Sequence, residues 1–363
     1  MRVKLEDVCE RGTSSLMQKD IVDKNGKYPV YGASGRIGSM ETYQQEHQTV
    51  AVVKDGAGIG RTMLLPEKSS VIGTMQYLIP KNCIESEYLY YVVKYMHLEK
   101  YFSGATIPHI YFRDYKTEEF NLHDKTEQRE IVSTLKRIEA IISNRQEQLT
   151  KLDELIKARF VEMFGDVISN SNLWPICKFS EITSSRLGKM LDAKQQTGVH
   201  RYPYLANFNV QWFRFELKTL NSMDFNESDR IEFELHDGDL LVCEGGEIGR
   251  CAVWHNNVQP CYFQKALHRV RCNKDFILPD FLAWWFKYNC DHGGFSAIEG
   301  AKATIAHLPG AKLKNLDVCV PPLPLQNQFA DFVAEVDKSK VEVQKALDQT
   351  QLLFDSLMQQ YFG

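Results

Sequence analysis

The feature that most constrains the fold of this chain is a long heptad repeat that occurs twice. Between Asp124 and Gly165, large apolar residues recur at alternating steps of three and four, with no glycine or proline before Gly165. This spacing places one apolar stripe along a helix, interrupted by Arg145 and Arg159, and is typical of coiled coils. Asp124, followed by Glu127 three residues later, matches a helix start. At 1.5 Å per residue the helix is about 55–60 Å long, which favours a rod that pairs with another helix.

A second copy of this stripe lies 198 positions further along the chain. It follows a proline-rich segment in which Pro324 suits the first helical turn, and it ends at Phe362-Gly363, as the first copy ends at Phe164-Gly165. The constant register predicts that the two helices pair with each other. The residues expected in this pairing are Ile131, Leu135, Ile138, Ile142, Leu149, Leu152 and Ile156 in the first helix, and Phe329, Val333, Val336, Leu347, Phe354 and Leu357 in the second.

The segments before the two helices repeat as well, in the same order. The matching pairs are 4–8 with 178–182, 50–61 with 239–250, 88–95 with 281–288, and 105–109 with 303–307. Because the offset only rises, from 174 to 198, a duplication whose second copy gained insertions accounts for the pattern. Residues 12–48 and 189–230 share no visible pattern, so the two domains are expected to agree in scaffold and to differ in this block.

Alternating and amphipathic patterns predict the secondary structure of the repeated parts. In the first domain we expect strands at 49–53, 61–65 and 71–79, and a helix at 85–102. The corresponding elements of the second domain are expected near 239–243, 250–254, 261–271 and 279–289. The region before residue 49, including residues 28–38, is expected to consist mainly of loops.

Composition places the chain among ordinary globular proteins. With 363 residues, 44% of them hydrophobic and 25% charged, it has room for two or three domains. No apolar run of 18 residues predicts a membrane span, and the first residues do not resemble a signal peptide. The nine cysteines include no Cys-x-x-Cys pair, which favours reduced thiols in a cytoplasmic protein over disulfides or a zinc site.

No motif for catalysis or nucleotide binding is present. The glycine-rich turn at 55–60 has the spacing G-x-G-x-G between two expected strands, so a hairpin with positive φ angles is favoured over a dinucleotide site. Arg61 and Arg250 directly follow this turn in the two copies, where they suit a solvated strand end or a contact to phosphate or base. His109 and His307 lie between a domain and its helix, where a structural role is favoured over a DNA or partner contact.

Segments 28–38 and 189–214 interleave basic, amide and aromatic residues. Such mixtures suit nucleic acid, because Lys and Arg neutralise phosphates while Arg, Asn and Gln read base edges. They also suit an ordinary polar surface. The net charge of −4 gives no general attraction to a polyanion, so a nucleic-acid surface would require the basic residues to gather on one face.

The whole pattern resembles the specificity (S) subunit of type I restriction–modification enzymes. The stretches that carry the resemblance are 28–32 (YPVYG), 103–110 (SGATIPHI), 126–132 (TEQREIV) and 320–326 (VPPLPLQ). Ala306 departs from the pattern, because the first copy has Pro108 at this position.

The resemblance implies an α+β fold of two tandem mixed α/β target-recognition domains, each followed by a long helix. The helices would pair as an antiparallel coiled coil, which gives an internal pseudo-twofold repeat. The expected domains are a first recognition domain at 1–124, a central helix at 125–165, a second recognition domain at 166–321 and a C-terminal helix at 322–363.

The resemblance also implies sequence-specific reading of double-stranded DNA at a bipartite, asymmetric target, without catalysis by this chain. The implied partners are two methyltransferase subunits and restriction subunits, with S-adenosylmethionine, ATP and Mg²⁺ on those partners, no cofactor or metal on this chain, and no membrane. The expected DNA contacts are Tyr31, Ser34, Arg36, Lys54, Arg61, Lys189, Lys194, Arg201, Tyr202, Asn207, Arg214, Arg250, Gln264 and Lys265. The expected residues at the domain–helix junctions are Thr106, His109, Thr304 and His307.

Two competing hypotheses remain at this point. The first is a coiled-coil scaffold whose two domains bind proteins instead of DNA. The second is an enzyme with an unfamiliar site, which the lack of an acid–base or metal constellation disfavours. Strong salt-dependent binding to duplex DNA would separate the recognition subunit from both.

Overall fold

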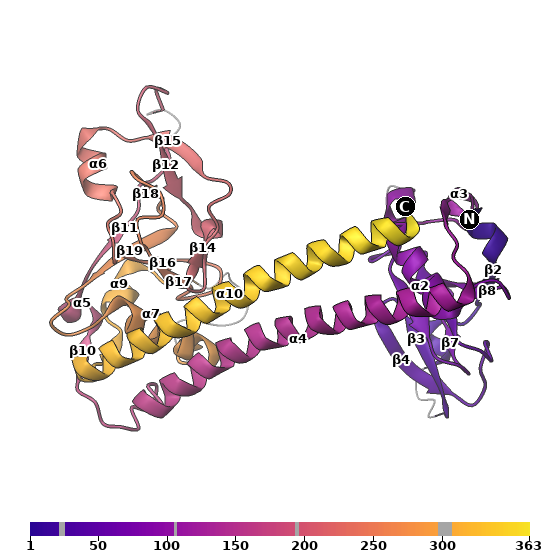
Figure 1. The fold of residues 1–363 in the computed structure, drawn as a ribbon. Helices are drawn as coiled ribbons and strands as arrows, with labels where there is room; N and C mark the ends of the chain where they lie inside the picture. The colour runs from indigo at the N-terminus through magenta and orange to yellow at the C-terminus, as the bar shows by residue number, and fades with distance from the viewer. Residues whose placement is uncertain (22–25, 105–106, 193–195, 297–306) are drawn as a thin grey trace. The chain divides into compact units, whose positions relative to one another are not determined.

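The computed structural model divides the chain into two compact units. It describes residues 1–21, 26–104, 107–192, 196–296 and 307–363. Unit 1 comprises Met1–Leu149 and Glu342–Gly363, and unit 2 comprises Thr150–Val341. The two long helices, α4 (Lys125–Phe164) and α10 (Leu323–Phe362), each contribute residues to both units (Figure 1). The expected division of the chain into recognition domains and long helices, with boundaries at residues 124, 165 and 321, stays a prediction.

Unit 1 contains a four-stranded and a three-stranded sheet. The larger sheet has the order β2 (Cys9–Thr13), β8 (Met75–Pro80), β5 (Thr49–Val53), β6 (Thr62–Leu65), and the smaller has the order β4 (Gly35–Met40), β3 (Tyr28–Gly32), β7 (Ser70–Val71). The remaining short elements are β1 (Arg2–Lys4), α1 (Leu5–Val8), η1 (Gln18–Asp20), α2 (Ser86–Tyr95), η2 (Leu98–Tyr101), α3 (Phe112–Tyr115) and β9 (Glu119–Asn121).

Unit 2 repeats both of these sheets strand for strand. Its larger sheet has the order β11 (Thr183–Leu187), β19 (Leu267–Cys272), β16 (Leu240–Cys243), β17 (Cys251–Val253), and its smaller sheet the order β15 (Asn221–Asp224), β12 (Arg201–Leu205), β18 (Tyr262–Phe263). The other elements are β10 (Ile176–Lys178), α5 (Phe179–Ile182), η4 (Asn207–Asn209), β13 (Val210–Gln211), β14 (Arg214–Phe215), α6 (Glu227–Phe233), α7 (Pro279–Asp291), α9 (Gly310–Lys314) and β20 (Asp317–Cys319). The expected α+β class and internal repeat are confirmed.

The expectation that the two variable blocks share no pattern is wrong. Strand β3 pairs in parallel with β7, with Tyr31 opposite Val71, and β12 pairs in parallel with β18, with Leu205 opposite Phe263. The two strands therefore correspond at an offset of 174, the same offset as the residues at the start of the repeat. A Tyr-Pro pair opens the correspondence, since Tyr28-Pro29 in the first copy matches Tyr202-Pro203 in the second.

The difference between the blocks is an insertion that follows the shared strand. Residues 28–38, expected as a loop, form most of the β3–β4 hairpin, whose connection is only two residues long. In unit 2 the corresponding strands, β12 and β15, are separated by the short hairpin β13–β14. The offset accordingly rises from 174 before the insertion to 189 after it. The scaffold is thus shared further than the sequence indicated, because backbone pairing holds the strands together despite their different side chains.

Two expected elements are shorter than predicted. The strand expected at 71–79 is two strands, β7 and β8, because the chain turns at Gly73, whose N–H donates to the carbonyl of Leu16 at 2.7 Å. The helix expected at 85–102 ends at Tyr95, and His97 adopts a left-handed conformation with φ of 50° before η2 begins. In the second copy, 261–271 likewise divides into β18 and β19, whereas α7 matches its expected range closely.

The two long helices pair in antiparallel fashion within each unit. In unit 1, Asn121, just before α4, donates to the carbonyl of Gly363 at 2.6 Å, whereas Arg145 donates to the carbonyl of Ala346 and the hydroxyl of Thr350. In unit 2, Lys340 forms an ion pair with Asp153 at 2.8 Å, and Phe160 packs against Phe329 with ring centroids 5.4 Å apart. The residues of the expected apolar stripe are buried or half-buried: Ile131, Leu135, Ile138, Ile142, Leu149, Leu152, Ile156, Phe329, Val333, Val336, Leu347, Phe354 and Leu357.

The end of each long helix completes the core of the unit that the other helix starts in. The ring of Phe164, at the end of α4, packs edge-on against Phe281 of α7 in unit 2, with centroids 4.8 Å apart. The ring of Phe362, at the end of α10, packs edge-on against Tyr88 of α2 in unit 1, with centroids 5.2 Å apart. Both phenylalanines are fully buried. Each unit therefore depends on a segment that lies far from the rest of it in the sequence.

A buried glutamine attaches each domain to the start of its long helix. The side-chain amide of Gln128 donates to the carbonyls of Cys83 and His123 at 3.0 and 2.9 Å, and its oxygen accepts the N–H of Glu85 at 2.9 Å. Glu85 is the N-cap residue of α2, and Gln128 has no exposed surface. One side chain thus satisfies three backbone groups that would otherwise be buried without partners.

The same three hydrogen bonds recur 198 positions later. The amide of Gln326 donates to the carbonyls of Phe276 and Pro321 at 3.0 and 2.7 Å, and its oxygen accepts the N–H of Leu278 at 2.8 Å. Leu278 is the N-cap residue of α7, the counterpart of α2. Gln128 and Gln326, called the junction glutamines below, are therefore a conserved feature of the two copies of this fold.

We expect Phe362→Ala to destabilise unit 1 and Phe164→Ala to destabilise unit 2, each by about 3–5 kcal/mol, because each opens a cavity in one core. Hydrogen–deuterium exchange should accelerate in α2 for the first variant and in α7 for the second. Leu352→Ala, on the 69% exposed Leu352 of α10, is the control and should change neither. Uniform acceleration in both units by either phenylalanine variant would contradict this assignment.

We expect Gln128→Leu and Gln326→Leu to lower the free energy of unfolding by at least about 3 kcal/mol each. The substitution keeps the side chain's bulk but leaves three buried backbone groups without partners, each of which costs about 1–3 kcal/mol. Urea unfolding monitored by tryptophan fluorescence and circular dichroism would measure the loss. Asn327→Leu, at an exposed neighbour in the same helix, is the matched control, and equal stability of all three variants would refute the role.

Candidate nucleic-acid interface

The glycine-rich turn of unit 1 is a tight hairpin between β5 and β6. Gly56, Gly58 and Gly60 have φ angles of 88°, 91° and 80°, a region that residues with a side chain rarely adopt. A Cβ atom on Gly60 would also lie 2.6 Å from the backbone nitrogen of Glu99. The element that follows is strand β6 and not a helix, so the expected hairpin is confirmed.

Arg61 connects this turn to the smaller sheet. Its Nη1 donates to the carbonyl of Ala33 at 2.8 Å, immediately after β3. Its guanidinium lies over the turn, because a Cβ atom built on Gly58 would be 3.5 Å from it. The exposed side chains of Ser34 and Arg36 follow Ala33 in the β3–β4 hairpin.

His109 contacts Asp55, the residue that opens the same turn. Its Nδ1 lies 2.6 Å from a carboxylate oxygen of Asp55, and the two residues also form a backbone bridge. Lys54 Nζ lies 3.6 Å from the same carboxylate, and the ring of His109 stacks on Tyr111 with centroids 6.2 Å apart. Arg113 lies over the Tyr111 ring at 4.8 Å. The structure therefore brings Lys54 and His109 together at one polar edge of unit 1.

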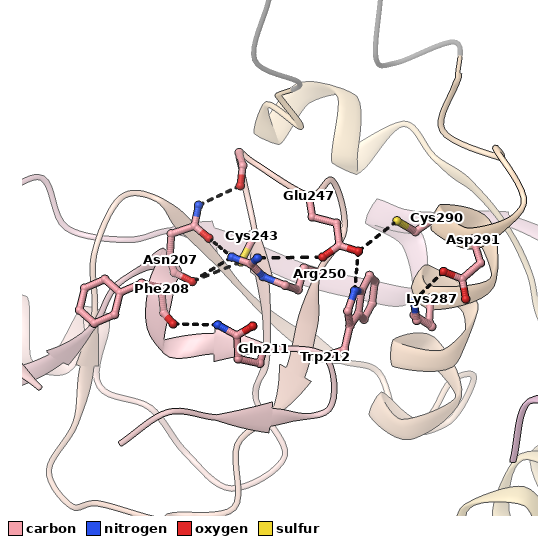
Figure 2. Close-up of polar contacts among 11 residues, drawn as sticks. Asn207, Phe208, Gln211, Trp212, Cys243, Glu247, Arg250, Lys287, Cys290 and Asp291 are labelled. Atoms are coloured by element: carbon pink, nitrogen blue, oxygen red, sulfur yellow. Dashed lines mark hydrogen bonds and ion pairs between the residues drawn. The ribbon is translucent and has the colours of Figure 1, made fainter. Parts of the chain in front are cut away.

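The corresponding turn of unit 2 carries a denser network (Figure 2). Nη2 of Arg250 donates to the side-chain oxygen of Asn207 at 2.6 Å and to its backbone carbonyl at 3.2 Å. The amide nitrogen of Asn207 in turn donates to the carbonyl of Gly245, in the turn itself, at 2.8 Å. Nη1 of Arg250 lies 4.0 Å from Glu247, whose carboxylate accepts Nε1–H of Trp212 at 2.8 Å.

The two arginines contact equivalent backbone positions. The strand correspondence, at an offset of 174, places Ala33 and Asn207 at the same position, one residue after the end of β3 and two residues after the end of β12, respectively. Arg61 and Arg250 both donate to the carbonyl of that residue. His307 likewise forms a backbone bridge with Gly245, as His109 does with Asp55. The spacing of residues in the sequence did not predict that the carbonyls of Ala33 and Asn207 accept these hydrogen bonds. The Tyr-Pro pair at the constant offset did, however, indicate that the two strands correspond.

Several expected DNA contacts in unit 2 already have internal partners. Lys189 forms an ion pair with Asp229, in which only 12% and 15% of the two side chains are exposed, and it lies 5.4 Å over the ring of Phe225. The hydroxyl of Tyr202 accepts a hydrogen bond from Arg230 at 3.2 Å. Such partners compete with phosphate for the amine and the hydroxyl, respectively.

The other expected contacts are placed as follows. Tyr31 is half-buried on β3, and Gln264 is half-buried beside β18, whereas the side chains of Arg201, Arg214 and Lys265 are exposed. Nη2 of Arg201 donates to the carbonyl of Ser222 at 3.1 Å. Lys194, Thr106 and Thr304 lie outside the described residues.

The thiols near the unit 2 network are held in the neutral form. Burial raises the pKa of Cys243, although the nearby charge of Arg250 opposes the shift. Burial and the carboxylate of Glu247 raise the pKa of Cys290 to about 11. Because the thiolate is the nucleophile, neither cysteine is activated. Among the described residues, no three His, Cys, Asp or Glu side chains gather in a way that could hold a metal ion.

Comparison with known proteins identifies the family. The family model for the type I restriction modification DNA specificity domain matches residues 1–153 and 172–350. The fold is similar to the crystal structure of a type I restriction–modification system S subunit from M. genitalium, with a TM-score of 0.61, 15% identity, and coverage of 100% of this chain and 96% of that one.

A second similar structure comes from work on complex assembly and conformational transition of the type I R-M system. It has a TM-score of 0.59 and 14% identity, and the match covers 99% of this chain and 97% of that one. In the part of the chain that the structure describes, no helix is long and apolar enough to span a bilayer. Because the family model covers most of the chain, in two successive copies, this protein belongs to the family of type I restriction–modification DNA specificity subunits.

Proposed function

We propose that this chain is the DNA-recognition subunit of a type I restriction–modification complex and reads a bipartite, asymmetric target. The observation that carries the proposal is that both units have the same strand order and the same glycine-rich turn. The loops that follow β3 in unit 1 and β12 in unit 2, by contrast, differ. Two equivalent scaffolds suit two half-sites, and different loops suit two different half-sequences. Family membership supports DNA as the ligand.

The exposed basic residues near the smaller sheets are the proposed phosphate contacts. Arg36 in unit 1 and Arg201, Arg214 and Lys265 in unit 2 have exposed side chains on or beside the strands of those sheets or the β13–β14 hairpin. Arg and Lys at such positions gain affinity by releasing counterions from DNA. Lys189 is half-buried and paired with a carboxylate, so it is the weakest candidate among the DNA contacts expected from the sequence.

The proposed partners are two methyltransferase subunits and, for cleavage, restriction subunits. We propose that S-adenosylmethionine, ATP and Mg²⁺ bind to those partners and that this chain contributes no catalytic group. Exposed apolar residues on the long helices, such as Leu155 and Val341 in unit 2 and Leu352 and Leu353 in unit 1, offer surface for such subunits. Trp284, Trp285 and Phe286 do not contribute to that surface, because they are buried in the core of unit 2.

We expect the chain, purified with its methyltransferase subunits, to select two short sequences separated by an unspecified gap from a random duplex pool. Its affinity should fall steeply with salt, because phosphate contacts release counterions. Long-read mapping of methylated adenines in cells with and without the gene should find the same target. A palindromic target would refute the asymmetric reading, and an absence of salt-dependent duplex binding would favour a protein-binding scaffold.

We further propose that the helices set the gap between half-sites, since α4 and α10 each have residues in both units. Insertion of seven residues between Ile142 and Leu149, and of seven between Lys340 and Leu347, preserves the heptad register. Each insertion adds roughly 10 Å of helix, which corresponds to about three base pairs at 3.4 Å each.

We expect the doubly extended protein to prefer a longer gap, with weaker binding. Three base pairs rotate the second half-site by about 100°, since one turn takes about 10–10.5 base pairs, and twisting DNA by that amount is costly. Binding to duplexes with fixed half-sites and every gap length would measure the preference. Insertion in one helix alone is the control and should disrupt the pairing, whereas an unchanged gap in a folded double variant would refute the idea.

A further inference from the structure

We propose that Arg61 and Arg250 are positioning residues, each of which fixes the start of a DNA-reading loop through a backbone carbonyl, and that the half-buried Arg250 does not itself contact DNA. This inference rests on the proposed function and deepens it. The two arginines follow the glycine-rich turn in the two copies, where a phosphate or base contact would otherwise be the natural role for them.

The geometry of Arg250 directs its guanidinium inward. Only 19% of its side chain is exposed. Nη2 is occupied by the carbonyl and side-chain oxygens of Asn207, and Nη1 faces Glu247 (Figure 2). Contact with a phosphate would require the guanidinium to give up these acceptors, including hydrogen bonds in a half-buried site, where they are stronger than in water.

The amide of Asn207 is also committed to this contact. Its nitrogen donates to Gly245 and its oxygen accepts from Arg250, so both ends of the amide are oriented by contacts within the protein. Asn207, Arg250 and Gly245 therefore form a closed set of hydrogen bonds between the turn and the end of β12. The next residue, Phe208, has 51% of its surface exposed, and the β13–β14 hairpin follows directly.

Unit 1 has the same contact with a different residue. Arg61 donates to the carbonyl of Ala33, which has no side-chain acceptor. The backbone carbonyl is thus the feature that both contacts share. Because every residue has such a carbonyl, an arginine can hold the loop at this position whatever its sequence. This explains why the arginine occurs in both copies, although the loops that follow the fixed carbonyl differ between them.

The assignment separates the residues that hold each loop from those that read DNA. The reading residues are expected after the fixed carbonyl, among residues 34–36 in unit 1 and 208–214 in unit 2. These segments contain the exposed side chains of Ser34 and Phe208, beside the proposed phosphate contacts Arg36 and Arg214.

The test uses the full chain in complex with its methyltransferase subunits and compares Arg250→Met, Arg250→Lys and Arg61→Met. For Arg250→Met we expect the preference for the correct second half-site to fall at least about tenfold. The preference for the first half-site and the slope of log affinity against log salt should stay unchanged. Arg61→Met should lower the preference for the first half-site and leave the preference for the second half-site unchanged. Each variant is therefore the other's control.

Arg250→Lys separates the two roles without removing the charge. Lysine cannot donate in the fixed fork of a guanidinium, so a positioning role predicts relaxed preference at the second half-site, as for Arg250→Met. A phosphate contact predicts near-normal binding for Arg250→Lys, and a salt slope reduced by about 0.9 for Arg250→Met. Either result, or a loss confined to one base pair, would overturn the proposal.

A DNA-free measurement keeps this inference distinct from the proposed function. Hydrogen–deuterium exchange of residues 206–215 should accelerate in both Arg250 variants, while α7 and the rest of unit 2 stay protected. If the wild-type complex shows no base preference, the proposed function fails whatever the exchange result. If the exchange of residues 206–215 does not change in folded variants, the positioning role fails whatever the binding result.

Discussion

The apolar pairing of α4 and α10 is the interaction on which the rest of the structure depends. Each helix begins beside one domain and ends in the core of the other unit, where Phe164 or Phe362 is fully buried. Neither core is complete without a segment supplied from the far end of a helix. The stripe is mostly apolar, and Arg145, one of its two polar members, donates to the carbonyl of Ala346 and the hydroxyl of Thr350. A polar group at such a position favours one register of a coiled coil over others.

The duplication fixes backbone geometry more strictly than side-chain chemistry. The strand orders of the two larger sheets agree, and so do those of the two smaller sheets, although their sequences are barely alike. The features shared by both copies act on the backbone: positive-φ glycines in the turn, an arginine that binds a carbonyl, and a glutamine that binds two carbonyls and an N–H. The unshared features are side chains on loops, which is where differences in a bound sequence can be accommodated.

Sequence reasoning predicted the long elements, in which a pattern repeats many times, and failed for the shortest strands. A forty-residue helix repeats its heptad often enough for α4 and α10 to be placed almost to the residue, and β5 matched its expected range. Strands β7, β13, β14 and β18 have two residues each, too few for alternation to show. The ion pair of Lys189 with Asp229 joins residues forty positions apart, and nothing in their local sequence indicates it. The DNA contacts of the individual side chains stay predictions.

The junction glutamines have a consequence for how the protein responds to its surroundings. An amide carries no charge and does not titrate, and its bonds to backbone groups in a dry site are not screened by ions. Contacts between basic side chains and phosphates, by contrast, weaken steeply as salt rises. Conditions that release a bound duplex would therefore leave each domain firmly attached to its helix. In the proposed complex with DNA, salt would therefore weaken the contacts to the duplex without weakening the contacts that join each domain to its helix.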